Sequence, residues 1–152
     1  MNVIARLYHS IIGGYRYTKI YDLIMAKRYE EALAIAKSIT VRGQLVSRIE
    51  LIEAELYYYL GQDYKALSSL QRVYNFLEED DELNAAIKEY LHCYASELFS
   101  NTCYQIKKEV SYPKIINREA IELEKVPNTI KQYFPLSVKL GPKGAVESKS
   151  PV

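Results

Sequence analysis

The chain has 152 residues, the size of a single domain, and its 49% apolar and 26% charged residues are those of an ordinary globular protein. A net charge of +1 argues against a surface dedicated to nucleic acid, and no run approaches the ~18 apolar residues that a membrane-spanning helix needs. The exceptional residue is tyrosine, with 15 copies against three Phe and no Trp. Tyrosine buries its ring while its hydroxyl keeps a polar partner, so this excess suits both half-buried core faces and interfaces.

Charge is distributed unevenly along the chain. Residues 1–42 carry a net charge of +4, residues 43–106 a net charge of −7 and residues 107–152 a net charge of +4. An acidic middle between basic ends would attract a basic partner, although a solvated surface with an uneven distribution explains the same pattern.

The compartment is predicted from the cysteines and the N-terminus. Cys93 and Cys103 would lie about 15 Å apart along one helix, too far for a disulfide, which favours a reducing compartment. The first 21 residues contain no acid and weakly resemble an organelle transit peptide, but they also fit the first helix of the domain. We therefore expect a cytoplasmic protein, with an organelle-targeted N-terminus as the alternative.

Five helices are predicted before the first proline. Apolar residues recur at helical steps over about 15–26, 29–39, 44–60, from Asp63 to Leu77 and over 82–108. Gly61 fits the stop of the third helix and Asp63 the N-cap of the fourth, while Asp80 and Asp81 fit the start of the fifth.

The composition changes near residue 112, because all five prolines lie in the last forty residues. We expect a short helix near 117–125 and irregular chain after it. The chain then divides into a helical domain over 1–111, an extension over 112–140 that packs on this domain, and a flexible tail over 141–152. No stretch predicts a strand, so the fold class is all-α.

Two ten-residue stretches, KRYEEALAIA from Lys27 and GQDYKALSSL from Gly61, lie 34 residues apart. In this register Ala32 coincides with Ala66, Leu33 with Leu67, Ala36 with Leu70 and Ile39 with Val73. A period near 34 with two helices per unit is typical of a helical solenoid.

The glycine in the turn, the small residues Ala32 and Ala66, and Tyr29 at the start of a second helix resemble the tetratricopeptide repeat family. The resemblance implies a short right-handed superhelix of antiparallel helical hairpins, with repeats over about 13–46 and 47–80. No breaker interrupts LHCYASELF, so we expect one long capping helix over 82–108 in place of a third hairpin.

The resemblance also implies that the first helix of each hairpin lines a concave groove. It selects as groove residues Tyr17, Tyr21, Ile24, Arg48, Leu51, Glu55, Tyr58, Glu89 and His92. Within the run Tyr57-Tyr58-Tyr59, the first tyrosine would pack inside its hairpin, the second would face the groove and the third would contact the neighbouring hairpin. Aromatic side chains beside carboxylates suit a partner peptide or helix with apolar and basic side chains. The alternative is that the chain's own basic and apolar C-terminal segment covers this strip.

Catalytic chemistry is not indicated. The two histidines lie in separate predicted helices, and adjacent His92 and Cys93 point about 100° apart, so they form no dyad. We expect no catalytic residue, no metal, no cofactor, no nucleic-acid partner and no membrane span.

We therefore predict a non-catalytic protein–protein interaction module, acting as an adaptor or as a scaffold subunit of a larger complex. The alternatives are a small chaperone or immunity-type protein that masks another protein, an RNA-binding helical repeat, and a helical enzyme with an unrecognised site.

Overall fold

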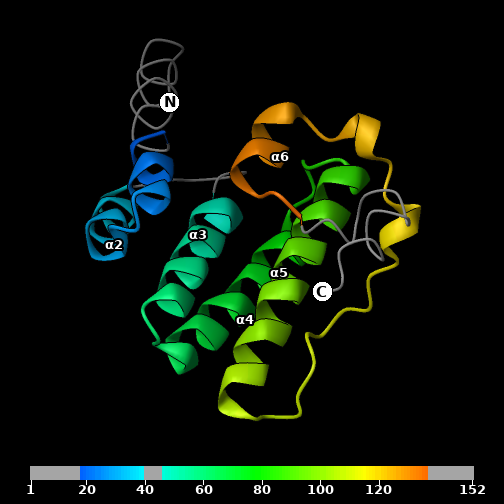
Figure 1. Cartoon of the computed structure of the whole chain (residues 1–152). Helices are drawn as coiled ribbons and strands as arrows, with labels where there is room; N and C mark the ends of the chain where they lie inside the picture. The colour runs from blue at the N-terminus through cyan, green and yellow to red at the C-terminus, as the bar shows by residue number, and fades with distance from the viewer. Residues whose placement is uncertain (1–17, 40–45, 137–152) are drawn as a thin grey trace, which may run out of the picture.

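The computed structural model describes residues 18–39 and 46–136 of the chain. Every regular element in these two ranges is helical and none is a strand, so the prediction of an all-α protein is confirmed (Figure 1). The elements are a helical segment at residues 18–25, α2 (Tyr29–Ser38), α3 (Val46–Tyr59), α4 (Asp63–Glu79), α5 (Ala85–Ile106), the 3-10 turns η2 (Arg118–Ala120) and η3 (Leu123–Lys125), and α6 (Asn128–Tyr133). Tyr17, Gly43 and the predicted tail lie outside the described residues.

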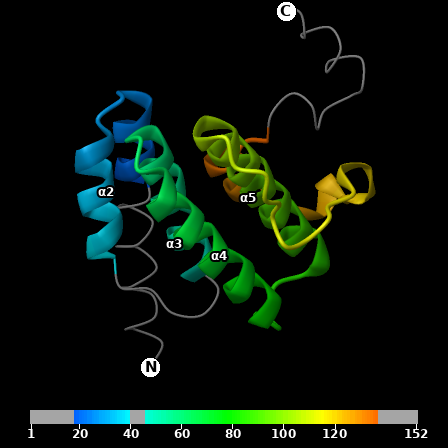
Figure 2. The ribbon, with the colours of Figure 1, turned by 90° about the horizontal axis from the view of Figure 1, so that it is seen from below.

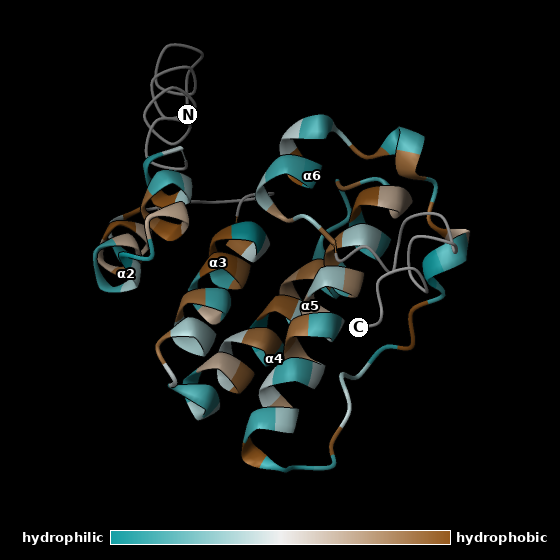
Figure 3. Cartoon of the chain, in the orientation of Figure 1, coloured by the Kyte–Doolittle hydropathy of each residue, from teal (hydrophilic) through white to brown (hydrophobic). Residues whose placement is uncertain are grey.

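Helices α2 to α5 pack in chain order: α2 contacts α3, α3 contacts α4, and α4 contacts α5 (Figure 2). Hydrophobic and hydrophilic positions alternate around each helix, so each has an apolar side to bury (Figure 3). The fully buried residues of the shared core include Leu51, Leu56, Leu70, Leu77 and Leu91. Burial of these apolar faces against one another therefore holds the helices together.

The turn that ends α3 has a close counterpart 34 residues earlier. Gly61 has φ 76° and Lys27 has φ 61°, both in the left-handed region. Each donates its N–H to the carbonyl three residues back, and the next residues, Gln62 and Arg28, donate to the carbonyl five residues back. This pair of hydrogen bonds is the Schellman motif, which satisfies carbonyls at a helix C-terminus. The same pair of hydrogen bonds also ends α5 at Lys107 and Lys108, so the motif is a shared form of helix ending and the 34-residue repeat stays a prediction.

The paired small and apolar positions of the repeat are also buried alike. Ala32, Ala66, Ala36 and Leu70 each have 0% of their surface exposed. A side chain larger than a methyl group at Ala32 or Ala66 would separate helices that now touch. The right-handed superhelix implied by the family resemblance stays a prediction.

Two predicted helix starts were wrong. The residue before α4 is Gln62, so Asp63 is the first helical residue and not the N-cap. Asn84 caps α5 through its side-chain oxygen, which accepts from the Ile87 N–H at 2.8 Å. Asp80 instead accepts from the N–H groups of the two loop residues 82 and 83, at 2.8 and 3.1 Å. Its carboxylate therefore stabilises a turn that delays the helix by three residues.

The extension after α5 was predicted less well than the helices before it. The expected helix over 117–125 is two 3-10 turns, and α6 occupies chain that was expected to be irregular. Proline, read from the sequence only as a breaker, directly precedes α6 at Pro127. Its fixed φ and its missing N–H are both tolerated at a helix start.

The extension runs back along α5 after the left-handed residue Lys107 (Figure 1). Five of its apolar side chains belong to the same core cluster as the helices: Tyr112, Ile121, Val126, Ile130 and Phe134. Phe134 is 1% exposed, which makes it one of the most deeply buried side chains described. The extension is therefore part of the core.

We predict opposite effects on stability at the two matched turns. Gly61→Ala should lower the free energy of unfolding by about 1 kcal/mol, because alanine is strained at φ 76° although its Cβ would meet no atom within 4 Å. Lys27→Gly should raise the free energy of unfolding by about 0.5–1 kcal/mol, because it relieves the strain of lysine at φ 61°. Urea unfolding followed by circular dichroism measures both.

The control is Lys88→Gly, inside α5, where the same chemical change should destabilise by about 1 kcal/mol. A destabilising Lys27→Gly of similar size would show that the turn at Lys27 does not depend on the left-handed conformation.

Candidate functional site

The structure brings three of the predicted groove residues together and buries two others. Tyr21, Ile24 and Glu55 line one pocket of about 200 Å³. Leu51 and His92 are 0% exposed, so neither side chain is available to a partner, and both predictions are corrected. Leu51 is inaccessible because α3 packs against α2, α4 and α5 at once.

The remaining predicted groove residues lie elsewhere. Arg48, Tyr58 and Glu89 are partly buried and do not line the pocket. Glu89 instead pairs with Lys114 of the extension at 3.6 Å. Tyr21, Ile24 and Glu55 thus share one pocket, whereas Glu89 and His92 of α5 do not line it, and the groove itself stays a prediction.

We call the cavity the Glu55 pocket. Its lining comes from the helical segment 18–25, from α3, from α5 and from the extension: Ile20, Tyr21, Ile24, Met25, Ile52, Glu55, Tyr59, Tyr94, Gln132, Tyr133 and Pro135. On α3 the lining residues are Ile52, Glu55 and Tyr59, which recur at steps of three and four and so share a face. The predicted face shared Glu55 with this one, but it had Leu51 and Tyr58 where the pocket has Ile52 and Tyr59.

Two tyrosines of the run on α3, Tyr57 and Tyr59, lie in different environments. Tyr57 is 7% exposed and lies between Lys37 and Lys65, whose Nζ atoms are 5.3 and 5.7 Å from its ring centre. Tyr59 stacks on Tyr29 of α2, with ring centres 4.7 Å apart, as predicted for a contact with the neighbouring hairpin. Tyr59 lines the pocket, whereas Tyr58, which was the predicted groove residue, does not.

Glu55 is the only charged residue among the described residues that line the pocket. Its two carboxylate oxygens accept hydrogen bonds from the hydroxyls of Tyr59 at 2.7 Å and Tyr94 at 2.5 Å. Burial raises the pKa of Glu55 above its ordinary value of 4.5, while the two tyrosine hydrogen bonds act in the opposite direction. Both donors are neutral, so the carboxylate has hydrogen bonds but no opposite charge from the lining residues.

The aromatic walls of the pocket are held in place by other rings. Tyr21 and Tyr133 meet edge to face, with ring centres 5.4 Å apart and planes 82° apart. Tyr94 meets Phe134 at 5.4 Å and 77°. These are favourable arrangements of aromatic quadrupoles, and they fix the rings before anything binds.

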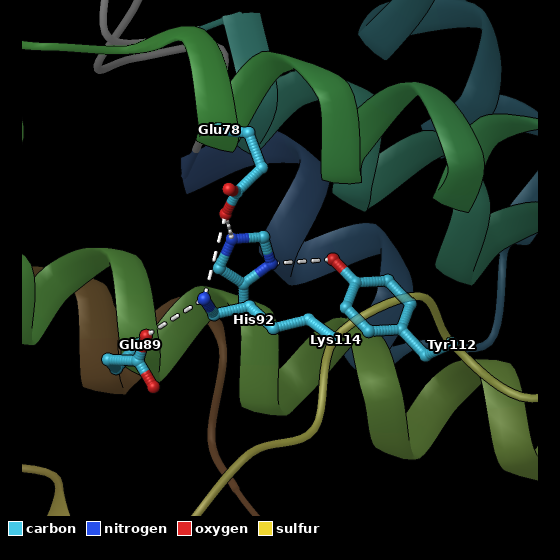
Figure 4. A network of polar contacts seen from close by, with 5 residues as sticks. All are labelled: Glu78, Glu89, His92, Tyr112 and Lys114. Atoms are coloured by element: carbon cyan, nitrogen blue, oxygen red, sulfur yellow. Dashed lines mark hydrogen bonds and ion pairs between the residues drawn. The ribbon is translucent and has the colours of Figure 1, made fainter.

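A second polar cluster joins α4, α5 and the extension around His92 (Figure 4). His92 Nε2 is 2.9 Å from Glu78 Oε2, and His92 Nδ1 is 2.7 Å from the Tyr112 hydroxyl. Lys114 lies 3.8 Å from the same Glu78 and 3.6 Å from Glu89.

The hydrogen-bond partners of His92 determine which of its ring nitrogens carries the proton. An ionised carboxylate only accepts, so Nε2–H donates to Glu78, and Nδ1 then accepts from the Tyr112 hydroxyl. Burial lowers the pKa of His92 below its ordinary value of 6.5, and Glu78 only partly offsets this. The ring is therefore neutral near pH 7 and is hydrogen-bonded on both sides. The cluster thus anchors the extension to α4 and α5.

Other contacts fasten the extension along its length. Arg118 donates to Glu97 of α5, and the Tyr90 hydroxyl donates to the Phe134 carbonyl at 2.8 Å. The sequence offered no signal for these pairs, because their partners are separated by 21 and 44 residues.

The two cysteines are buried free thiols. Burial raises the pKa of Cys93 to about 11, so it is a protonated thiol and a poor nucleophile near pH 7. In the part of the chain that the structure describes, no group of three or more His, Cys, Asp or Glu could hold a metal ion. Within residues 18–39 and 46–136, no helix is both long enough and apolar enough to cross a bilayer.

Comparison of the chain with known protein families, with curated proteins and with solved structures finds no match.

We predict that Tyr112→Phe lowers the free energy of unfolding by about 1–3 kcal/mol, because it leaves the buried Nδ1 of His92 without a donor. The aromatic contacts of the ring with Tyr74 and Phe99 would remain. Tyr104→Phe is the matched control, since Tyr104 is 85% exposed and should change stability by less than about 0.5 kcal/mol. Equal urea midpoints for the two variants would contradict a fastening role for His92.

Proposed function

We propose that this chain is a non-catalytic protein–protein interaction module of the tetratricopeptide-like kind, acting as an adaptor or scaffold subunit. The matched buried positions 34 residues apart, Ala32 with Ala66 and Ala36 with Leu70, support the repeat. A stack of helical hairpins offers a rigid surface for a partner.

The observation that carries the proposal is the Glu55 pocket. Among its described lining residues, Met25 is 65% and Tyr59 is 41% exposed. Large apolar and aromatic side chains around a concave site are typical of places where a partner inserts an anchor residue.

The proposal assigns no reaction to this pocket. Among the described residues that line it there is one carboxylate, which two tyrosine hydroxyls hold, and no histidine, cysteine or lysine. The two buried free thiols support a reducing compartment, in keeping with the expected cytoplasmic location.

We predict that a photo-crosslinking residue in place of Met25 captures partner proteins in cells that produce this chain. Met25 lines the pocket and is largely exposed, so its replacement leaves the core intact. The matched control is the same residue in place of Ile115, which is 97% exposed on the extension and does not line the pocket.

Mass spectrometry of the adducts should find a discrete set of proteins at position 25 that is missing at position 115. The same set at both positions, or no adduct at either, would contradict the proposal.

A further inference from the structure

Among the described residues, none supplies a counter-charge to the buried Glu55 carboxylate. It is 9% exposed, and neither the ion pairs of the described residues nor the lining of the pocket supplies a cation to it. Withdrawal of an ionised carboxylate from water is costly unless an opposite charge compensates. A cation that entered the pocket from outside would supply that compensation.

The rings around the carboxylate also favour a cation. Four tyrosines line the pocket, and the pair Tyr21 and Tyr133 forms two walls nearly at right angles. The negative face of an aromatic ring attracts a positive charge. This chain already uses such contacts elsewhere, with Lys37 and Lys65 at Tyr57 and Lys108 at Tyr64.

The hydrogen bonds of Glu55 discriminate between the two common protein cations. A guanidinium group pairs best with both oxygens of a carboxylate at once. Here each oxygen already accepts a tyrosine hydroxyl, one from α3 and one from α5. An ammonium group is a compact charge that needs only one remaining lone pair and can sit against the rings.

We propose that the Glu55 pocket binds an alkylammonium group of a partner protein, carried by lysine or by methylated lysine. The tyrosine rings surround the cation, and Glu55 supplies the opposite charge. This inference rests on the proposed function and names the chemistry of the anchor residue.

The test is a titration of the full chain with four capped amino acids: N-acetyl N-methylamides of lysine, trimethyllysine, arginine and norleucine. Binding is followed by NMR of the methyl groups of Ile20, Ile24 and Ile52, which line the pocket. Both lysine forms should bind about tenfold tighter than norleucine and tighter than arginine. Tighter binding of trimethyllysine would identify a methylated anchor, and tighter binding of lysine an unmodified one.

Glu55→Gln keeps the shape and removes the charge, so it should abolish the preference for lysine over norleucine. Glu53→Gln is the matched control, because Glu53 lies on the same helix and does not line the pocket. It should leave the preference unchanged. The comparison of lysine with norleucine needs no variant, so it holds even if Glu55→Gln folds poorly.

Equal binding of norleucine and lysine by the wild type, a preference that survives in Glu55→Gln, or no methyl shift with either lysine form would overturn the inference. If the wild type shows no preference for lysine but the cross-links at position 25 persist, this inference is refuted and the proposed function is not. Loss of those cross-links would refute the proposed function itself.

Discussion

The packing of the extension against α5 is the contact on which the rest of the structure depends. A helix that packs on one side only leaves any other apolar face exposed to water. Here the last helix, α5, is covered by the chain itself, which turns at Lys107 and returns along it. Tyr112, Ile121, Val126, Ile130 and Phe134 supply the apolar cover. Full burial of one such side chain is worth about 1.5–3 kcal/mol, so these five residues are comparable to the whole net stability of a domain.

The polar contacts of the extension hold it at a defined position along α5. His92 can satisfy both ring nitrogens only if Tyr112 and Glu78 lie on opposite sides of it. The Tyr90 hydroxyl fixes the other end through the Phe134 carbonyl. Tyr133 and Pro135 then reach the Glu55 pocket, so the extension that closes the core also builds one wall of the candidate site. Any partner in that pocket would contact the extension as well as α3.

Local signals in the sequence predicted local structure. The glycine at position 61 marked the end of α3, and the paired alanines at 32 and 66 marked buried helix contacts, because backbone conformation and close helix packing each demand particular residue types. Asn84 and Asp80 are both residue types that cap a helix N-terminus, so the sequence alone does not show where α5 begins. In the folded loop Asn84 caps the helix, and Asp80 stabilises the turn before it. The position of α6 depends on the burial of Ile130 and Phe134 against helices far away in sequence, which no local pattern reveals.

The candidate site was predicted in part for the same reason. Tyr21, Ile24 and Glu55 were selected by the family resemblance, which implies that one face of each first helix lines a groove. The neighbours of α3 decide which of its faces lines the pocket, and this face keeps Glu55 but has Ile52 and Tyr59 in place of Leu51 and Tyr58. Tyr94 and Tyr133 join the pocket through contacts between distant segments and carried no sequence signal.

The central claim is that the extension is part of the cooperative core, and native-state hydrogen exchange tests it most directly. The Ile130 and Phe134 amides donate within the extension at 3.0 and 2.9 Å and lie on buried residues. The account predicts that they exchange about as slowly as the Leu91 amide in the middle of α5, while the amide of exposed Ile115 exchanges fast. Exchange of Ile130 and Phe134 at the rate of Ile115 would show that the extension opens independently, and would contradict the account.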